Sequence, residues 1–261
     1  MKNLFFIYIF IAVVSLSCKK EDIASASTTP STNCRIQEQY GEKYVYNADG
    51  FITKRTGTYL DANNKTVTYE VEHIYTDGLL TSVKEDGIAT EAYSYTNGVL
   101  SQIKLLVNND PDYKDYKINI ETDVNKRIIK MTDTNGLQSD LKRDEKGNLI
   151  EVITINVNTK KVISRYVRSN FDGKKTHHEL LKGWQFDVRK YYGDYMDQPN
   201  FIIGGSGNAL NIKIYGENNL LTFDADYLYT YTFEGYWKTQ DFTNKINGVK
   251  SSSSLLFDGC K

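Results

Sequence analysis

Short hairpin units recur along most of this chain, and they constrain its fold more than any other feature. Residues 44–54, 73–84 and 93–104 each have aromatic or aliphatic residues at alternate positions, an Asp-Gly pair or an Asn-Gly pair, and then a second alternating run. Such pairs suit the type I′ turn, in which both central residues need a positive φ. Weaker copies at residues 117–131, 141–152 and 166–176 extend the series. Each unit predicts a two-stranded hairpin, and a recurring unit of this size is a supersecondary repeat.

Other turn signals fall between these hairpins, among them Asp61–Asn64 and Asp86-Gly87. Alternating runs separated by frequent turn signals predict a continuous antiparallel meander, here of about fourteen strands. A flat sheet of that size would expose long edges, a problem that natural proteins solve by closure or curling. We therefore expect an all-β domain, curled or closed into a barrel-like body. A short helix at Asp187–Met196 is the best helical candidate.

The first seventeen residues have the features of a secretory signal. Lys2 supplies a positive charge, Leu4–Val14 forms an apolar run, and small residues follow at Ser15–Ser17. The apolar run is too short for a stable membrane-spanning helix, which needs about 20 residues. A basic start, a short apolar run and small residues indicate that residues 1–17 are a cleaved signal peptide.

Cys18 follows at once and resembles the lipidated cysteine of a bacterial lipobox, although Ser15 stands where a leucine is usual. The alternative is ordinary signal cleavage without lipidation. The resemblance implies a membrane anchor at Cys18. Lys19 is not the Asp that typically retains lipoproteins in the inner membrane, so we expect an outer membrane lipoprotein that is periplasmic or exposed at the cell surface.

Residues 18–33 are polar and rich in Ser and Thr, a composition that cannot bury enough apolar surface to fold. They predict a disordered tether. Lys20, followed by the acidic residues Glu21 and Asp22, also resembles the surface-export signal of Bacteroidetes lipoproteins, and a solvated spacer explains the same residues. Residues 34–261 then form a single β-meander domain.

The net charge excludes one class of function, and the cysteine content predicts a disulfide. The whole chain has a formal net charge of −1, so it lacks the basic excess of a nucleic-acid-binding protein. If Cys18 carries lipid, Cys34 and Cys260 remain, near the two ends of the domain. An even number of cysteines in an oxidising compartment predicts a disulfide, with two unpaired thiols as the alternative.

Two resemblances accompany these patterns. The Tyr-x-Tyr-x-x-Asp-Gly-x-Leu pattern resembles the tyrosine–aspartate repeats of Rhs-type shell proteins. Over Cys34–Cys260, the chain is similar to a Bacteroidetes lipoprotein family of unknown function with a porin-like β fold. That resemblance rests on the anchor, Cys34, the hairpins, and the segments Tyr191–Asn200 and Tyr227–Thr239. It implies a strand arrangement and no activity, and we expect a body that is soluble in water.

Catalytic and metal-binding patterns are weak. His73 lies on an alternating run, and the pair His177-His178 would point to opposite faces of an extended strand. The acidic clusters Asp110–Asp112 and Asp224–Asp226 are more simply turns than calcium sites. The glycine-rich stretch 204–207 lacks the Lys-Ser/Thr of a phosphate loop and predicts a mobile hairpin loop. We therefore predict no catalytic residue, no metal, no cofactor and no enzymatic activity.

Aromatic side chains are the remaining candidates for ligand binding. Exposed Tyr and Trp can stack on sugar rings, whereas in a meander the same residues also fill the core and form cross-strand pairs. The stacking candidates are Trp184, Tyr191, Tyr192, Tyr195, Tyr236 and Trp237. We expect a non-enzymatic binding or structural module anchored in the envelope, whose candidate partners are a glycan or an envelope protein. The alternative is a glycan-binding accessory lipoprotein that uses exposed aromatics.

Overall fold

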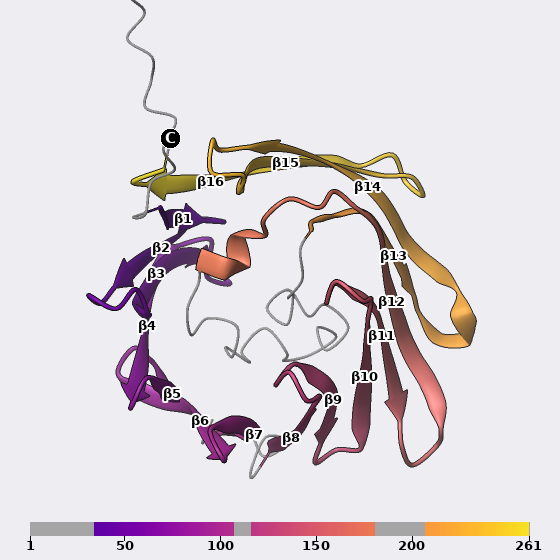
Figure 1. Ribbon diagram of the computed structural model, residues 1–261, viewed down its shortest axis with the longest axis horizontal. Coiled ribbons are helices and arrows are strands. Elements are labelled where there is room, and N and C mark those ends of the chain that lie inside the picture. The colour runs from indigo at the N-terminus through magenta and orange to yellow at the C-terminus, as the bar shows by residue number, and fades with distance from the viewer. Residues whose placement is uncertain (1–33, 107–115, 181–206, 261) are drawn as a thin grey trace, which may run out of the picture.

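The sheet of this protein closes on itself. A computed structural model describes residues 34–106, 116–180 and 207–260. In these ranges sixteen strands follow one another, each paired antiparallel with its neighbour in the chain, and the last strand pairs with the first. Figure 1, which looks into the barrel, shows the ring of strands from β1 round to β16. The predicted all-β antiparallel meander and its closure are confirmed.

The strands run between the following residues. They are β1 (Arg35–Gln39), β2 (Glu42–Tyr46), β3 (Ile52–Leu60), β4 (Thr66–Thr76), β5 (Leu79–Glu85), β6 (Ile88–Thr96), β7 (Val99–Leu105), β8 (Lys117–Thr122), β9 (Ile128–Asp133), β10 (Leu137–Arg143), β11 (Leu149–Asn156), β12 (Lys161–Phe171), β13 (Ala209–Tyr215), β14 (Leu221–Tyr231), β15 (Trp237–Asn244) and β16 (Lys250–Asp258). Two short 3-10 helices are η2 (His177–Leu180) and η5 (Glu217–Asn219).

Turn chemistry explains the hairpins. Asp77 and Gly78 have φ values of 51° and 75°, and Asn97 and Gly98 have values of 53° and 71°. Both central residues of each turn are therefore left-handed, as the type I′ geometry requires. Other turns begin with an Asp or Asn whose side chain accepts backbone N–H groups. In one of them, Asp61 Oδ1 accepts bonds from Asn63 and Lys65, both at 2.8 Å.

The strand count of about fourteen was too low, and one reason lies at the first turn. Tyr40 and Gly41 form a tight turn between β1 and β2, with φ values of 52° and 80°. Because Tyr stands where Asp or Asn is usual, this turn carries no sequence signal.

Three further expectations are corrected. The Asp172-Gly173 pair begins a long connection rather than a hairpin, since β13 starts only at Ala209. Asp224–Asp226 lies within β14 and is not a turn. His177 and His178 belong to η2 rather than to a strand. The helix expected at Asp187–Met196 lies outside the described residues.

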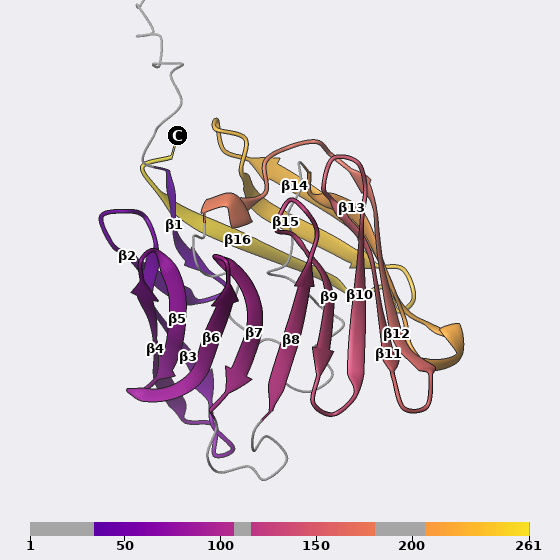
Figure 2. The same cartoon turned by 60° about the horizontal axis from the view of Figure 1, so that its bottom comes forward.

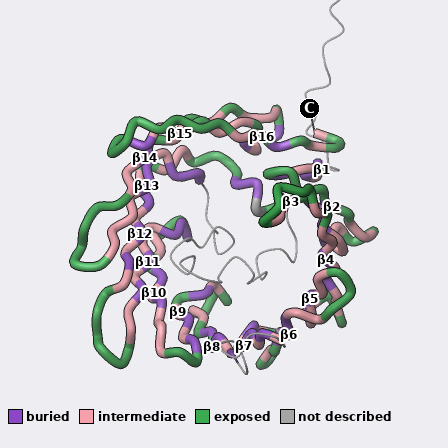
Figure 3. The backbone as a smooth tube through the Cα atoms, turned by 180° about the vertical axis from the view of Figure 1, so that it is seen from behind, coloured by how far each residue is buried: buried purple, intermediate pink, exposed green. Residues whose placement is uncertain are grey.

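The core lies on the inner wall of the barrel. On β4, Val71 and His73 are 0% and 4% exposed, whereas Glu70 and Glu72, which alternate with them, are only half-buried. The same alternation appears in the burial of other strands, such as β8, β11 and β12, and Figure 3 shows buried residues within the ring of strands and exposed residues at its protruding turns. The alternation follows from the two-residue period of a strand, which sends successive side chains to opposite faces.

The outer wall carries ion pairs between neighbouring strands. Lys54 Nζ lies 2.7 Å from Glu70 Oε1, and Lys130 Nζ lies 3.4 Å from Glu121 Oε1. Charged pairs of this kind suit a wall in contact with water. Among the described residues, no helix is long and apolar enough to span a bilayer.

The barrel is closed by a seam and a disulfide. Arg35 and Ile36 of β1 pair with Asp258 and Phe257 of β16. Cys34 and Cys260, just beyond these pairs, are joined by a disulfide across a Cα–Cα distance of 4.5 Å. The predicted pairing is confirmed. We call this end of the barrel the disulfide rim. It also holds the β4–β5, β6–β7, β10–β11 and β14–β15 turns, and Figure 2 shows the strands from the side.

Candidate functional site

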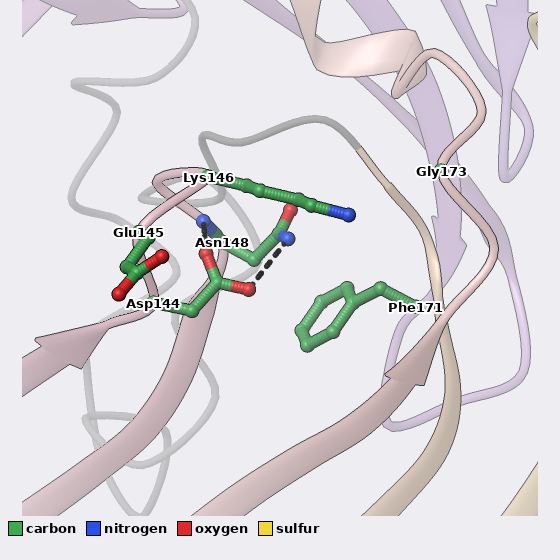
Figure 4. A pocket seen from close by; sticks show the side chains of 6 residues that line it. All are labelled: Asp144, Glu145, Lys146, Asn148, Phe171 and Gly173. Atoms are coloured by element: carbon green, nitrogen blue, oxygen red, sulfur yellow. Dashed lines mark hydrogen bonds between the residues drawn. The ribbon is translucent and has the colours of Figure 1, made fainter.

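A pocket of about 380 Å³ opens at the disulfide rim, between the β10–β11 turn and the end of β12. Its lining residues are Asp144, Glu145, Lys146, Asn148, Phe171 and Gly173. Figure 4 shows the ring of Phe171 facing the paired side chains of Asp144 and Asn148, with Lys146 extended beside them and Glu145 pointing away. The pocket therefore combines an apolar ring with polar groups, as small-molecule sites commonly do.

The polar side of the pocket is fixed by its turn. Asp144 Oδ1 accepts a 2.8 Å bond from the backbone N–H of Asn148, and Oδ2 accepts a 2.8 Å bond from Asn148 Nδ2. Burial alone would raise the pKa of Asp144, but these hydrogen bonds outweigh burial and lower it. Asp144 is thus a fixed carboxylate, and Asn148, at 2% exposed, is a fixed amide. The Oδ1 atom of Asn148 has no hydrogen-bond partner among the described residues.

Contacts at the end of β12 fix the position of Phe171, the apolar side of the pocket. The guanidinium carbon of Arg168, on β12, lies 5.5 Å from the centre of the Phe171 ring. Asp172 follows and accepts hydrogen bonds from the backbone N–H groups of Lys174 at 2.8 Å and Asn208 at 2.9 Å, and from the Tyr231 hydroxyl. These bonds hold the end of β12 against the start of β13.

An aromatic column continues from Tyr231 down the inner wall of β14. The ring centres of Tyr229 and Tyr231 are 6.4 Å apart, and those of Tyr227 and Tyr229 are 6.2 Å apart. Burial raises the pKa of both Tyr227 and Tyr229, and the nearby charge of Arg168 opposes the rise. The sequence predicts that these tyrosines share one strand face, and the ring contacts confirm it.

His177 and Trp237 form a buried pair beside this column. Trp237 Nε1 donates a 2.6 Å bond to His177 Nδ1, and His177 Nε2 lies 3.0 Å from Gln39 Nε2. Trp237 is 2% exposed, so it has almost no surface to offer a sugar ring. η2 is thereby tied to β1 and β15.

The other predicted stacking residues are divided between two places. Tyr236 is half-buried, and the Lys175 ammonium lies 5.1 Å from its ring centre. Its stacking role stays a prediction. Trp184, Tyr191, Tyr192 and Tyr195 lie outside the described residues, as do Cys18 and the tether.

Sequence reasoning missed a polar group on the opposite inner wall. Arg55 Nη1 donates to Glu42 Oε2 at 2.8 Å, and the Tyr69 hydroxyl donates to Glu42 Oε1 at 2.7 Å. On β6, the Tyr93 hydroxyl donates a 2.5 Å bond to Glu91, which is fully buried. Strand alternation gives the only sequence signal, because it places Arg55 and Glu91 at inward positions.

The acidic clusters offer no evident metal site. Lys245 Nζ lies 2.8 Å from Asp226 Oδ1 and 3.4 Å from Asp224 Oδ1, so it forms an ion pair with both carboxylates. Lysine thus occupies the place that a cation would take. Cys34, Glu234 and Cys260 have ligand atoms within 4.8 Å of one another, but the disulfide removes the two thiolates that a metal would need. Asp110–Asp112 lies outside the described residues.

Comparison with known proteins identifies the type of fold that this chain has. No protein-family model and no curated protein matches the chain. A crystal structure of a porin-like protein from Bacteroides uniformis is similar, with a TM-score of 0.54 and 10% identity, over 87% of this chain and 94% of that one. A porin-like protein from Bacteroides vulgatus has a TM-score of 0.41 and 12% identity, over 86% and 99%. At such identities the first likeness shows the fold alone, and that fold is a porin-like β-barrel.

Proposed function

We propose that this chain is a non-enzymatic binding module, held at the bacterial envelope by a lipid on Cys18. The observation that carries the proposal is the rim pocket, in which Asp144, Asn148 and Phe171 are held by a turn and by a strand end. The Asp144 carboxylate, paired with Asn148, keeps its charge at neutral pH, since hydrogen bonds lower the pKa of Asp144. Such a group can orient a ligand but is a poor proton donor at neutral pH.

The envelope location is supported by two independent features. The signal, the cysteine and the polar tether at residues 1–33 form one continuous pattern. The ion pairs of the outer wall suit a body that stands in water beside a membrane, since a lipid-facing barrel wall presents an apolar band.

Anchoring is tested by Cys18→Ser with fatty-acid labelling and membrane fractionation. We expect the variant to lose the label and to leave the membrane fraction. An unlabelled variant that stays with the membrane would contradict the lipid anchor.

A glycan is the second candidate, as ligand of this pocket. A ring face next to carboxylate, amide and ammonium groups matches the apolar faces and hydroxyl edges of a sugar. A glycan array followed by calorimetry tests it. Phe171→Ala should weaken binding of any array hit at least about 10-fold, the equivalent of one well-packed contact. Phe233→Ala is the matched control, because Phe233 is 55% exposed and lies at the same rim outside the pocket. Equal affinities of the two variants would exclude this pocket.

A further inference from the structure

Arg168 is a buried cation on the inner wall, and no described residue forms an ion pair with it. Its side chain projects inward from β12, opposite Ile212 of β13, and it is 6% exposed. Its Nε and Nη1 atoms are buried, and no acceptor among the described residues forms a hydrogen bond with either. The centre of the Phe171 ring lies 5.5 Å from its guanidinium carbon.

This arrangement is costly unless something compensates it. A buried charge normally has a partner, because the loss of its hydration is far larger than the gain from packing. A ring face attracts a guanidinium but satisfies none of its N–H groups. Arg168 therefore lacks an acceptor that it needs.

Arg168 lies close enough to a second arginine, Arg143, for their charges to interact. The pKa of Arg143 is lowered to about 10, first by burial and then by the charges of Arg127 and Arg168, whereas the charge of Asp123 opposes the shift. Arg127 is neutralised by Asp123, whose Oδ2 lies 2.7 Å from its Nε atom. Arg143 stands on β10 and Arg168 on β12, with β11 alone between them. Arg143 and Arg168 therefore place two like charges near each other on this wall.

We infer that Arg168 is the recognition residue of an oxyanion site inside the barrel, and that its ligand carries a carboxylate or sulfate group. A guanidinium has a planar fork of N–H donors that matches a carboxylate or sulfate through two parallel bonds. The bound anion supplies the missing acceptor and neutralises the buried charge.

The site deepens the proposed function, on which its choice of sugar rests. Phe171 lines the rim pocket, and the guanidinium carbon of Arg168 lies 5.5 Å from the centre of its ring. Asn148 Oδ1, which lacks a donor, faces the same pocket and can accept a sugar hydroxyl. A sugar ring on Phe171 with its acidic substituent on Arg168 uses all three groups, so the ligand class is an acidic saccharide.

Small anions test the site without any sugar. Thermal unfolding of the full chain is followed in sodium chloride, acetate and sulfate at equal ionic strength, for the wild type and for Arg168→Met. We expect acetate or sulfate to raise the Tm of the wild type by about 5 °C more than that of the variant at near-saturating anion. The comparison with the variant matters because sulfate stabilises most proteins by exclusion from their surface.

Arg165→Met is the matched control. Arg165 lies on the same strand but points outward, where its Nε atom pairs with Glu151 at 2.6 Å. This variant should keep the full anion response. An equal anion response of wild type and Arg168→Met would overturn the site. Should Arg168→Met not fold, Arg168→Lys keeps the charge without the fork and should lose most of the acetate response.

Sugars separate this inference from the proposed function. Galacturonic acid oligosaccharides, a sulfated chondroitin disaccharide and neutral galactose oligosaccharides are titrated into the full chain. The inference expects an acidic sugar to bind at least about 10-fold more tightly than the neutral one, with the preference abolished in Arg168→Met. Equal binding of acidic and neutral sugars would overturn the inference and keep the glycan function. An anion response without binding of any sugar would keep the oxyanion site at Arg168 and overturn the glycan function.

Discussion

The Tyr95 hydroxyl donates a 2.8 Å hydrogen bond to the backbone carbonyl of Leu80, which joins the β6–β7 hairpin to the hairpin before it. The same relationship recurs earlier, where Tyr75 donates to the Ile52 carbonyl at 2.8 Å. Tyr75 and Tyr95 each stand three residues before a turn glycine. The tyrosine of the repeat is therefore a link between hairpins, and burial raises the pKa of Tyr95 to about 12, so it remains a neutral donor.

We expect Tyr95→Phe to lower the free energy of unfolding by about 1 kcal/mol, the usual net contribution of one hydrogen bond. Denaturant unfolding measures this loss. Tyr59→Phe is the control, because the Tyr59 side chain is 54% exposed and no described residue accepts a bond from its hydroxyl. Equal losses in the two variants would mean that the Leu80 bond contributes nothing.

Local turn chemistry and strand alternation predict most of this fold. The pairs at Asp77-Gly78 and Asn97-Gly98 carry their geometry in their own residues, and barrel closure follows from the number of strands and their edges. The rim pocket could not be found in this way. Phe171 and Asn148 come from different strands, and their approach depends on the stagger of the closed barrel. The lack of an acceptor for Arg168 is likewise a property of packing, which no local pattern records.

Gly98 tests the turn geometry. Gly98 has a φ of 71°, and a Cβ atom added there would meet no heavy atom within 4 Å. The cost of Gly98→Ala is therefore conformational alone, and we expect a loss of about 1–2 kcal/mol in unfolding free energy.

Gly216 is the matched control for this variant. Its φ of −84° is accessible to any residue, and an added Cβ would make an ordinary contact of 3.4 Å with Thr222. Gly216→Ala should be within about 0.5 kcal/mol of the wild type. Gly207, in the predicted mobile loop, is unsuitable because its added Cβ would lie 3.0 Å from Phe171 and from the Gly173 backbone. Similar losses at Gly98 and Gly216 would contradict the left-handed turn.

The disulfide tests the seam. Cys34 and Cys260 are separated by 226 residues, so their bond restricts nearly the whole unfolded domain. The chain-entropy model gives an upper limit of about 5 kcal/mol for so long a loop. We expect reductant to lower the stability of the wild type towards that of the Cys34→Ser/Cys260→Ser double variant, and to leave the double variant unchanged. A double variant as stable as the oxidised protein would show that strand pairing alone holds the seam.

The last prediction concerns acid stability at the rim. Burial alone would raise the pKa of Asp172, but hydrogen bonds from Tyr231, Lys174 and Asn208 outweigh burial and lower it. Because the folded pKa lies below the unfolded value of about 3.9, the stabilisation is fully present above that value and is lost as pH falls through the folded pKa. Asp172→Asn lacks the charge at every pH. Denaturant unfolding at several pH values from 7 to 3 should therefore show a difference in stability between wild type and variant that is constant down to about pH 5 and shrinks below pH 4. A difference that stays constant down to pH 3 would mean that the hydrogen bonds from these three residues do not favour the ionised carboxylate.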